Sequence, residues 1–358
     1  MKEGLVIETG FATSTGGRRP VTYAIKADVK YILSVAMDQF VTRIAFLDMQ
    51  NRFVTQPVKM QLDLMKEQDT LEILAGFIKQ SILNSGIPTE KILGIGIGMP
   101  GFVNPRKGLN YTFLGGGEAN ISQYIFDSVG IPVFIDNDSS LIALSECRFG
   151  TAKDLKEAMV INVGWGIGLG LILHGDLYRG HDGFAGELSH IPLFDNGRIC
   201  GCGKSGCLET EASLGIIVSK AKEGLEQKKP TSIRITNWDD KGEAIREIML
   251  AAQRGDRFAV SLFTEAGYNI GRGVAILIHL MNPQLVILSG RGSAAGKVLM
   301  APVQQAINEY CIPRLCHNIE IRVSDLGDKA ELIGAAALVM ENLDKIEKQH
   351  HHIEALAS

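Results

Sequence analysis

Short apolar runs alternate with amphipathic stretches along most of the chain, and this alternation divides it into strands and helices. An apolar run of about four to eight residues between turn residues is typical of a buried strand, and apolar residues three and four apart are typical of a helix. In the first half the pattern predicts three strands, a helix, a strand, a helix, a strand and a further helix. The strands read YILSVAM, RIAFLDM, FVTQPVKM, ILGIGIGMPG and PVFID, and the helices cover about 70–84, about 121–129 and a stretch starting near Ser139.

A comparable order of elements then begins again. The runs AMVINVG, GLGLILH and DLYRG predict three more strands, with His174–Gly175–Asp176 as a tight hairpin turn. Helices follow, then the strands PQLVILSG and IEIRVSD, and a closing helix over about 329–341. Two successive βββαβα halves predict an internal duplication. We therefore expect an α/β fold of two domains with an interdomain cleft, which is a common place for a small ligand.

Three segments lie outside this repeated pattern. Residues 227–241 are polar and irregular, which predicts a surface loop between helices. The tail with His350–His352 predicts a loosely held, solvated helix. Residues 1–27 read as two short β-segments, a hairpin that is marginal alone. We expect four parts: this hairpin region over 1–27, an α/β domain over 28–136, a second over 137–329, and a C-terminal helix that packs back on the first domain, with its tail, over 330–358.

The composition is that of a globular protein with a substantial core. Of the 358 residues 46% are hydrophobic and 21% are charged, and the net charge of −4 argues against a general nucleic-acid coat. No apolar run approaches the roughly 18–20 residues of a membrane span, and the N-terminus does not resemble a signal peptide. Six cysteines without an export signal point to a reducing compartment. We expect a soluble cytoplasmic protein.

Three of the cysteines stand together in CGCGKSGCLE. Cys200, Cys202 and Cys207 are separated by glycines, which let a short loop bring several sulfurs to one point. His190, ten residues before the first of them, is a nitrogen ligand of the right type for tetrahedral Zn²⁺. A disulfide between Cys200 and Cys202 would be strained, and a nucleophilic thiol needs a paired base. The spacing favours a structural zinc site closed by four ligands, with free buried thiols as the alternative.

The segment around this cluster resembles the signature region of a known family. GWGIGLGLILHGDLYRGHDGFAGELSHIP followed by CGCGKSGCLETEAS is similar to that region of the ROK family of repressors, open reading frames and kinases, and the resemblance extends over nearly the whole chain to GAAALVM. It implies the actin-like, ribonuclease H-like fold of two α/β domains. It also implies that a loop over about 187–209 binds zinc and shapes a sugar pocket. The implied zinc ligands are His190, Cys200, Cys202 and Cys207.

The resemblance further implies which side chains contact a sugar or sugar phosphate. Sugars are bound by carboxylates and amides that bond several hydroxyls at once. In the family the residue matching Asp138 is the base that deprotonates the attacked hydroxyl. Capping of the following helix is the alternative role for Asp138, and a structural role is the alternative for Glu187 and Glu209. The matching residues are Asn137, Asp138, Glu187, His190 and Glu209.

The predicted pocket departs from the family pattern at several positions. Ser140 stands where the kinases usually have an asparagine, and Ser189 replaces the glycine of the Glu-x-Gly-His motif. Thr112, in TFLGGG, stands where a sugar-contacting asparagine is expected. Asn110 lies close enough in the sequence to substitute for it. For this reason the sequence does not identify the sugar.

The segment after the first predicted strand bears on kinase activity. Family kinases have D-x-G-G-T there, where the aspartate manages Mg²⁺ and the glycines let backbone N–H groups approach phosphate. Here Ala36 replaces the aspartate and Asp38–Phe40 replace Gly-Gly-Thr, so the loop is degenerate over Ala36–Thr42 and we do not expect Mg-ATP to be used. Glycines of GWGIGLG and LSGRGS survive as a vestigial nucleotide site, although such glycines also serve hairpins and close packing. They are Gly164, Gly166, Gly168, Gly290 and Gly292.

The first residues resemble the wing and linker that follow the helix-turn-helix in the family's repressors. The recognition helices themselves do not occur in this sequence. Arg18 and Arg19 are candidates for contacts with DNA phosphates, but two arginines supply little affinity, and a solvated linker is the alternative.

Together these observations predict the sugar-sensing, effector-binding and oligomerisation part of a ROK repressor, without phosphoryl transfer. A sugar or sugar phosphate would shift domain closure, and a homodimer or dimer of dimers would transmit the change. Operator DNA is a partner only if a helix-turn-helix lies upstream, and no membrane partner is expected. Two alternatives remain: an ATP-dependent kinase of a hexose or amino sugar, and a zinc-stapled assembly module.

Overall fold

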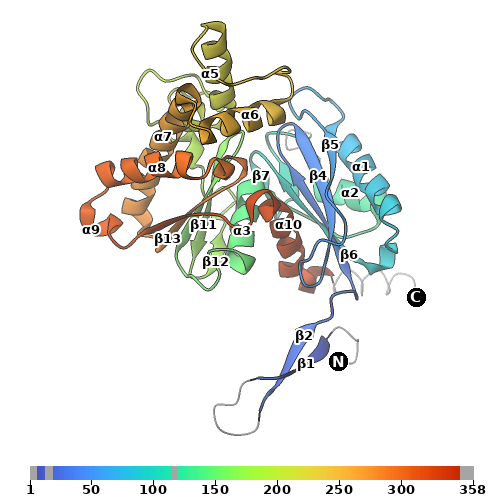
Figure 1. Cartoon of the computed structure of the whole chain (residues 1–358). Helices are drawn as coiled ribbons and strands as arrows, with labels where there is room; N and C mark the ends of the chain where they lie inside the picture. The colour runs from blue at the N-terminus through green and yellow to red at the C-terminus, as the bar shows by residue number, and fades with distance from the viewer. Residues whose placement is uncertain (1–5, 13–18, 115–118, 347–358) are drawn as a thin grey trace. The chain divides into compact units, whose positions relative to one another are not determined.

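The computed structural model describes residues 6–12, 19–114 and 119–346, which form two compact units (Figure 1). The first unit contains the described residues up to Asp138 and those from Leu332 onward, and the second is Ser139–Glu331. Arg18 and the predicted tail with His350–His352 lie outside the described residues. Within the described ranges, no helix has both the length and the apolar character needed to cross a membrane.

The first unit is built on a five-stranded mixed sheet with the order β5-β4-β3-β6-β9. β3, β4 and β5 form an antiparallel meander, and β6 and β9 add in parallel on the other side of β3. A short ribbon, β7–β8, precedes helix α2. The elements are β3 (Tyr31–Met37), β4 (Val41–Asp48), β5 (Val58–Gln61), α1 (Thr70–Ser85), β6 (Ile92–Met99), β7 (Val103–Asn104), β8 (Leu109–Asn110), α2 (Ile121–Val129), β9 (Val133–Asn137) and α10 (Ala330–Glu341).

Different helices cover the two faces of this sheet. Alternate residues of β3, among them Leu33 and Met37, belong to one buried apolar cluster with residues of α1 such as Leu74. The other face carries Gly96, where an added Cβ would stand 1.9 Å from the carbonyl oxygen of Ala335 in α10. The backbone of α10 therefore approaches β6 closely, and this approach requires a residue without a side chain.

The second unit repeats the same sheet. Its strand order is β12-β11-β10-β13-β14, again a meander of three antiparallel strands followed by two parallel additions. Numbered within each half, both sheets have the order 3-2-1-4-5, which confirms the predicted duplication. The elements are α3 (Asp138–Phe149), β10 (Ala158–Val163), β11 (Ile167–Leu173), β12 (Asp176–Tyr178), α4 (Glu209–Ala212), α5 (Leu214–Glu226), α6 (Lys241–Gln253), α7 (Arg257–Met281), β13 (Leu285–Ser289), α8 (Lys297–Tyr310), α9 (Pro313–Cys316) and β14 (Glu320–Val323).

The turn between β11 and β12 is the one that the sequence predicts. Leu173 pairs with Asp176, so His174 and Gly175 form a two-residue loop. Both have positive φ, 56° and 83°, as a type I′ hairpin turn requires.

One predicted strand is shorter than its apolar pattern indicates. FVTQPVKM was expected to be continuous, but β5 begins only at Val58. Phe53 forms an isolated bridge with Leu47, and the pairing with β4 resumes after Pro57. Proline has no N–H to donate to a neighbouring strand, which explains the interruption.

The predicted N-terminal hairpin is present as β1 (Val6–Phe11) and β2 (Val21–Ile25), which pair antiparallel. Its large apolar side chains are exposed, and Phe11 reaches 68%. The hairpin therefore buries little apolar area of its own, as expected for two strands without a third.

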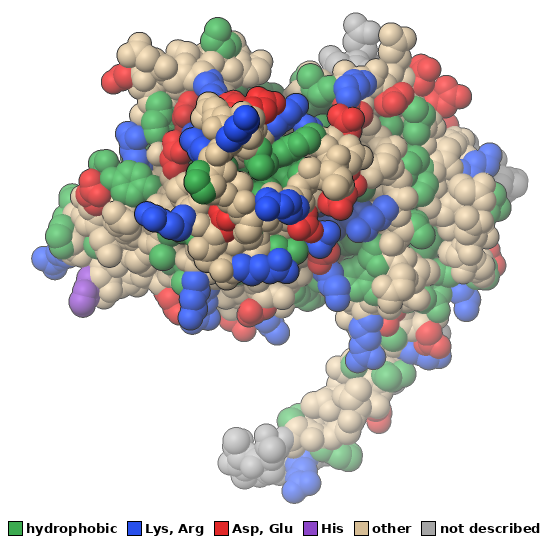
Figure 2. All heavy atoms as spheres, turned by 45° about the horizontal axis from the view of Figure 1, so that its top comes forward, with side chains coloured by type: hydrophobic (Ala, Val, Ile, Leu, Met, Phe, Trp, Pro, Cys, Tyr) green, Lys and Arg blue, Asp and Glu red, His purple; other side chains and the backbone are tan. Residues whose placement is uncertain are grey.

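Positive and negative side chains are interspersed over the face of the molecule in Figure 2. A nucleic-acid surface is marked instead by a basic stripe or patch. The face in view lacks such a stripe among its described side chains, which fits the small net charge of −4.

Asp256, which precedes α7, forms hydrogen bonds that connect the polar loop 227–241 to the start of this helix. Its carboxylate accepts hydrogen bonds from the backbone N–H groups of Ala259 and Ser232 and from the hydroxyls of Ser232 and Thr231. Burial opposes ionisation of this group, but the donors outweigh burial and lower the pKa of Asp256 to about 2.

Replacing Asp256 by asparagine should lower the free energy of unfolding by about 1 kcal/mol at neutral pH, a value that allows for screening of a half-exposed charge. Because the folded-state pKa lies below the unfolded value of about 3.9, this stabilisation is fully present above about pH 5 and is lost as the pH falls toward 2. Urea unfolding between pH 7 and pH 3 should show the difference between parent and Asp256→Asn shrinking. A difference that stays constant would contradict this role.

Candidate functional site

The predicted metal ligands meet at one point in the second unit. The ligand atoms of His190, Cys200, Cys202 and Cys207 all lie within 4.8 Å of one another. The Sγ atoms of Cys202 and Cys207 are 3.6 Å apart, and Sγ of Cys200 is 3.5 Å from Nδ1 of His190. A tetrahedral site with metal–sulfur bonds of about 2.3 Å places its sulfurs about 3.8 Å apart. The cluster therefore has the dimensions and the donor atoms of a closed metal site.

The loop that carries the cysteines is a small hairpin closed by backbone hydrogen bonds. The N–H of Cys200 donates to the carbonyl oxygen of Lys204 (2.7 Å), and Cys207 forms a bridge with Pro192. Gly206 has φ 74°, and a Cβ there would stand 1.9 Å from the carbonyl oxygen of Phe194. The glycines between the cysteines thus permit both the turn and the close approach that bring the sulfurs together.

Burial separates the three thiols. Cys200 and Cys207 are buried and Cys202 is exposed. Burial raises the pKa of Cys207 to about 12 and also raises that of Cys200, whereas the backbone N–H of Lys204 lowers the pKa of Cys202. A metal ion that binds here has to displace the protons of two buried thiols, so its affinity falls with falling pH.

Two predicted sugar-binding carboxylates stand beside this cluster. Oε2 of Glu187 lies 3.8 Å from Nε2 of His190. This is the other ring nitrogen from Nδ1, which lies close to Cys200. Burial raises the pKa of Glu209, against the attraction of His190 and a hydrogen bond from the backbone N–H of Ile167. Glu187 and Glu209 thus both interact with His190, which is itself a member of the metal cluster.

A glycine at the tip between β10 and β11 makes room for Glu209. A Cβ on Gly166 would stand 2.5 Å from Oε2 of Glu209. The tip is closed by a hydrogen bond from the N–H of Gly164 to the carbonyl oxygen of Gly166 (2.9 Å). The carboxylate of Glu209 therefore occupies the space that a side chain at position 166 would fill, a role for Gly166 that sequence reasoning did not assign.

Close packing also accounts for three of the other predicted nucleotide-site glycines. A Cβ on Gly168 would stand 1.9 Å from Oγ of Ser139, and one on Gly290 would stand 2.1 Å from Oδ1 of Asn162. A Cβ on Gly292 would stand 2.5 Å from Cγ1 of Val163. These glycines have a structural role whether or not a nucleotide binds.

Replacing Gly168 by alanine should destabilise the protein by about 1–3 kcal/mol, because the new methyl group meets Ser139 inside a packed layer. Gly164→Ala is the matched control, since the nearest atom to its Cβ is 3.6 Å away. Thermal unfolding of both variants measures the contrast. Equal melting temperatures would show that the layer relaxes around the added methyl group.

The predicted sugar contacts of the β8 region are already engaged within the first unit. Asn110 is 1% exposed, and its Oδ1 accepts from the backbone N–H groups of Thr112 and Phe113 (both 2.9 Å). Its Nδ2 donates to the carbonyl oxygen of Pro100 (3.0 Å). Oγ1 of Thr112 accepts from the N–H of Phe102 (3.0 Å). Both side chains shape the loop, and this is the role the structure shows for them.

Asn137 and Asp138 stand where β9 ends and α3 begins. The side-chain amide of Asn137 donates to the carbonyl oxygen of Gly101 (3.1 Å). Asp138 is the first residue of α3, where its carboxylate also stabilises the positive end of the helix dipole. The position suits either a base or a helix-stabilising residue, the two roles left open by the sequence.

The turn between β3 and β4 is closed by its own carboxylate. Oδ1 of Asp38 accepts hydrogen bonds from the backbone N–H groups of Phe40 and Val41, both at 2.8 Å. The carbonyl oxygens of Gln39 and Phe40 accept from the chain at 62–64, which holds the turn in place. Ala36, on the strand before the turn, is fully buried. An aspartate whose side chain accepts hydrogen bonds from its own turn is a known local signal. The sequence comparison with the family's Gly-Gly-Thr does not reveal this role of Asp38.

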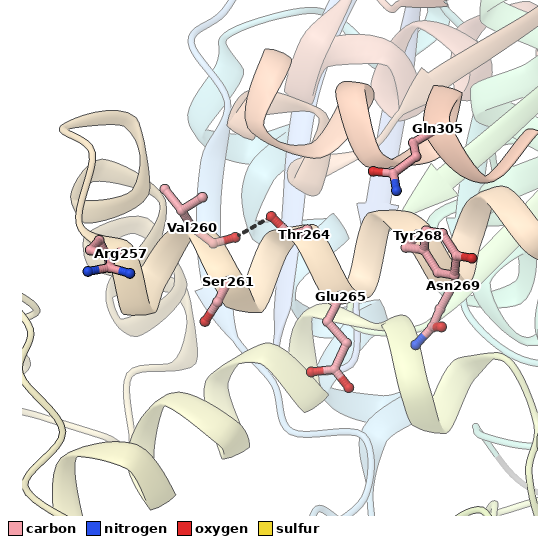
Figure 3. Close-up of a pocket in the computed structure, with 8 residues that line it drawn as sticks. All are labelled: Arg257, Val260, Ser261, Thr264, Glu265, Tyr268, Asn269 and Gln305. Atoms are coloured by element: carbon pink, nitrogen blue, oxygen red, sulfur yellow. Dashed lines mark hydrogen bonds between the residues drawn. The ribbon is translucent and has the colours of Figure 1, made fainter. Parts of the chain in front are cut away.

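A separate pocket of about 520 Å³ runs along α7 (Figure 3). Its Glu265 is paired with Lys220 at 2.8 Å. None of the residues that the sequence predicts for metal, sugar or nucleotide binding belongs to it. Its lining residues are Arg257, Val260, Ser261, Thr264, Glu265, Tyr268, Asn269 and Gln305.

Comparison with known proteins finds both repressors and kinases. The xylose repressor of Caldicellulosiruptor bescii is 31% identical over 96% of this chain and 86% of its own length. The N-acetylglucosamine repressor of Escherichia coli O157:H7 is 28% identical over 95% of this chain and 82% of its own length. The glucokinase of Halalkalibacterium halodurans is 33% identical over 72% of this chain and 79% of its own length.

Solved structures show the same division. A ROK family transcriptional regulator described as a homolog of the E. coli MLC protein has a TM-score of 0.78 at 25% identity, covering 96% of this chain and 87% of its own. A ROK family glucokinase from Streptomyces griseus, in complex with glucose and AMPPNP, has a TM-score of 0.77 at 26% identity and covers 87% and 99%. The chain shares their actin-like fold of two α/β domains. A model of the ROK family matches residues 55–342, and the chain belongs to the ROK family.

Proposed function

We propose that this chain is the effector-binding part of a cytoplasmic, sugar-responsive transcriptional repressor, and that it does not transfer phosphate. The observation that carries the proposal is the turn between β3 and β4. Its backbone N–H groups already donate to the carboxylate of Asp38. A phosphate would have to displace this carboxylate and would be repelled by its charge.

A second observation supports the same conclusion. Phosphoryl transfer depends on positioning and on neutralising charge, which in this fold requires a carboxylate to hold Mg²⁺. The side chain available on β3 is the buried methyl group of Ala36. Asp138, if it acts as a base, cannot replace either function.

The extent of the similarities agrees with a repressor. Three repressor relatives align over 95–97% of this chain, two glucokinase relatives align over 70–72%, and the Streptomyces griseus glucokinase structure covers 87%. Some repressors carry the sugars xylose and N-acetylglucosamine in their names. The identity of 33% with a glucokinase keeps an ATP-dependent sugar kinase as the second candidate.

The proposed effector is a sugar or sugar phosphate, and its proposed contacts are Glu187, His190, Glu209, Asn137 and Asp138. The proposed metal is structural Zn²⁺, because three sulfurs and one nitrogen at tetrahedral spacing suit it and leave no ligand position open. Nδ1 of His190 would bind the zinc while Nε2 faces Glu187, so the metal would orient an effector-binding side chain.

We further propose that the chain acts as a homodimer or dimer of dimers. Operator DNA is a partner in this proposal only if a helix-turn-helix lies upstream of the β1–β2 hairpin, because the pair Arg18 and Arg19 supplies little affinity.

The test is the thermal stability of the purified chain with hexoses, pentoses, amino sugars and their phosphates, each with and without Mg-ATP. A ligand that binds only the folded state raises the melting temperature. At a hundredfold excess over Kd it adds about 2.7 kcal/mol to the free energy of unfolding. We expect one sugar class to stabilise the chain and Mg-ATP to add nothing. Stabilisation by Mg-ATP alone would favour the kinase, and no response to any sugar would contradict the sensor.

A further inference from the structure

Cys202 differs from the other members of the metal cluster because it is exposed. Cys200 and Cys207 are buried, and His190 is half-buried. A reagent in solution therefore reaches the sulfur of Cys202 before it reaches either of the other two. The Sγ atom of Cys202 lies 3.6 Å from that of Cys207.

We propose that Cys202 and Cys207 form a reversible thiol–disulfide switch, in which a hydroperoxide reacts first with Cys202 and the resulting disulfide releases the metal. This inference rests on the metal site of the proposed function. A metal-bound cysteine is held as thiolate, the form that reacts with peroxide.

The chemistry balances with hydrogen peroxide as the oxidant. The Cys202 sulfur attacks one peroxide oxygen, the O–O bond breaks, and Cys202 becomes a sulfenic acid while hydroxide leaves. The Cys207 sulfur then attacks the Cys202 sulfur and displaces the second hydroxide, which forms the S–S bond. Each sulfur gives up one electron, the two hydroxides take up two protons to become water, and the metal loses two of its four ligands.

The loop can accommodate this bond. The sulfurs have to approach from 3.6 Å to about 2.05 Å, so one of them has to move by roughly 1.6 Å. The backbone on both sides of Cys202 is uncrowded, since an added Cβ on Gly201 or Gly203 would meet nothing within 4 Å. Cys207 is fixed by its bridge to Pro192, so Cys202 is the partner that moves.

The switch also has a consequence for the effector site. Nδ1 of His190 lies against Cys200 in the cluster, and its Nε2 faces Glu187. Loss of the metal removes the constraint on this ring, and with it the position of a side chain proposed to bind the sugar. Oxidation should therefore reduce the response to effector at least tenfold in apparent affinity.

The experiment treats the full zinc-loaded chain with one to five equivalents of hydrogen peroxide. Released zinc is followed with a chromogenic chelator, and the chain is then digested with trypsin without reduction. Cleavage after Arg198 and Lys204 places Cys202 in ICGCGK and Cys207 in SGCLETEASLGIIVSK. We expect one zinc released per chain, these two peptides linked, and fragmentation that assigns the bond to Cys202. Dithiothreitol with added zinc should restore the parent state.

Two cysteine-to-serine variants test whether zinc release depends on Cys202. Cys316→Ser is the matched control, because Cys316 is the other cysteine that is partly accessible to solvent, and this variant should leave zinc release unchanged. Cys202→Ser should abolish the linked peptides, and the peptide map of the parent decides the question if this variant is unstable. A disulfide inside ICGCGK, a linked pair assigned to Cys200, or oxidation of Cys316 with zinc retained would each overturn the proposal.

Failure of the thiol–disulfide switch can be distinguished from failure of the proposed sensor function. If no sugar stabilises the reduced chain, the sensor is wrong, while peroxide-driven zinc release still tests the switch. If a sugar stabilises the reduced chain and peroxide leaves both the zinc and the response unchanged, the switch alone is wrong.

Discussion

Replacing Cys207 by serine is expected to lower the zinc content and the melting temperature together. Cys207 is fully buried, its sulfur lies 3.6 Å from that of Cys202, and its backbone bridges to Pro192. Because structural metal binding contributes to folding, a site filled at a thousandfold excess over Kd adds about 4 kcal/mol. For a unit of this size that corresponds to roughly 10 °C in melting temperature.

Zinc per chain by atomic spectroscopy and thermal unfolding measure the two effects. Cys147→Ser is the control, since Cys147 is also buried but lies outside the cluster, and it should keep the zinc. A chelator applied to the parent chain should reproduce the loss of stability seen in Cys207→Ser. Full zinc occupancy in Cys207→Ser would show that the cluster is not the metal site.

Replacing Glu209 by glutamine is expected to weaken effector binding about 10- to 100-fold. A hydrogen bond to a charged group contributes about 1.5–3 kcal/mol, and glutamine keeps the volume while losing the charge. Glu209 lies at the start of α4, two residues after the last proposed metal ligand, and is attracted electrostatically by His190. Zinc content should not change, because Glu209 is not a member of the cluster.

Calorimetric titration with the sugar found in the stability screen measures this effect. Glu211→Gln is the matched control on the same helix, where the carboxylate accepts a hydrogen bond from the backbone N–H of Arg198. The control should bind the effector as the parent does. If Glu209→Gln also binds it unchanged, Glu209 has a structural role only, which is the alternative that its sequence leaves open.

The fold could be predicted because its signals are local. Each buried strand appears as an apolar run, and α2 follows its predicted bounds of 121–129. The shortening of β5 also has a local cause, since Pro57 interrupts the pairing. The order 3-2-1-4-5 within each half then follows from the repeated sequence of elements.

The candidate site could be predicted only where a short motif carries it. The cysteine spacing and His190 lie within one loop, so the cluster followed from the sequence alone. The role of Asn110 depends on the carbonyl oxygen of Pro100, and that of Gly168 on Ser139. Such contacts join residues ten to about thirty positions apart, and spacing along the chain does not reveal them.

The two repeated sheets differ at the turn that joins their first two strands. The turn between β3 and β4 and the tip between β10 and β11 hold equivalent places in the repeated sheets. In one copy a carboxylate closes the turn, and in the other glycine leaves room for Glu209. Each copy of a duplicated sheet can therefore change its first turn without altering the same turn in the other copy. If the proposed function holds, the difference between a sugar sensor and its kinase relatives can arise from substitutions in a single turn.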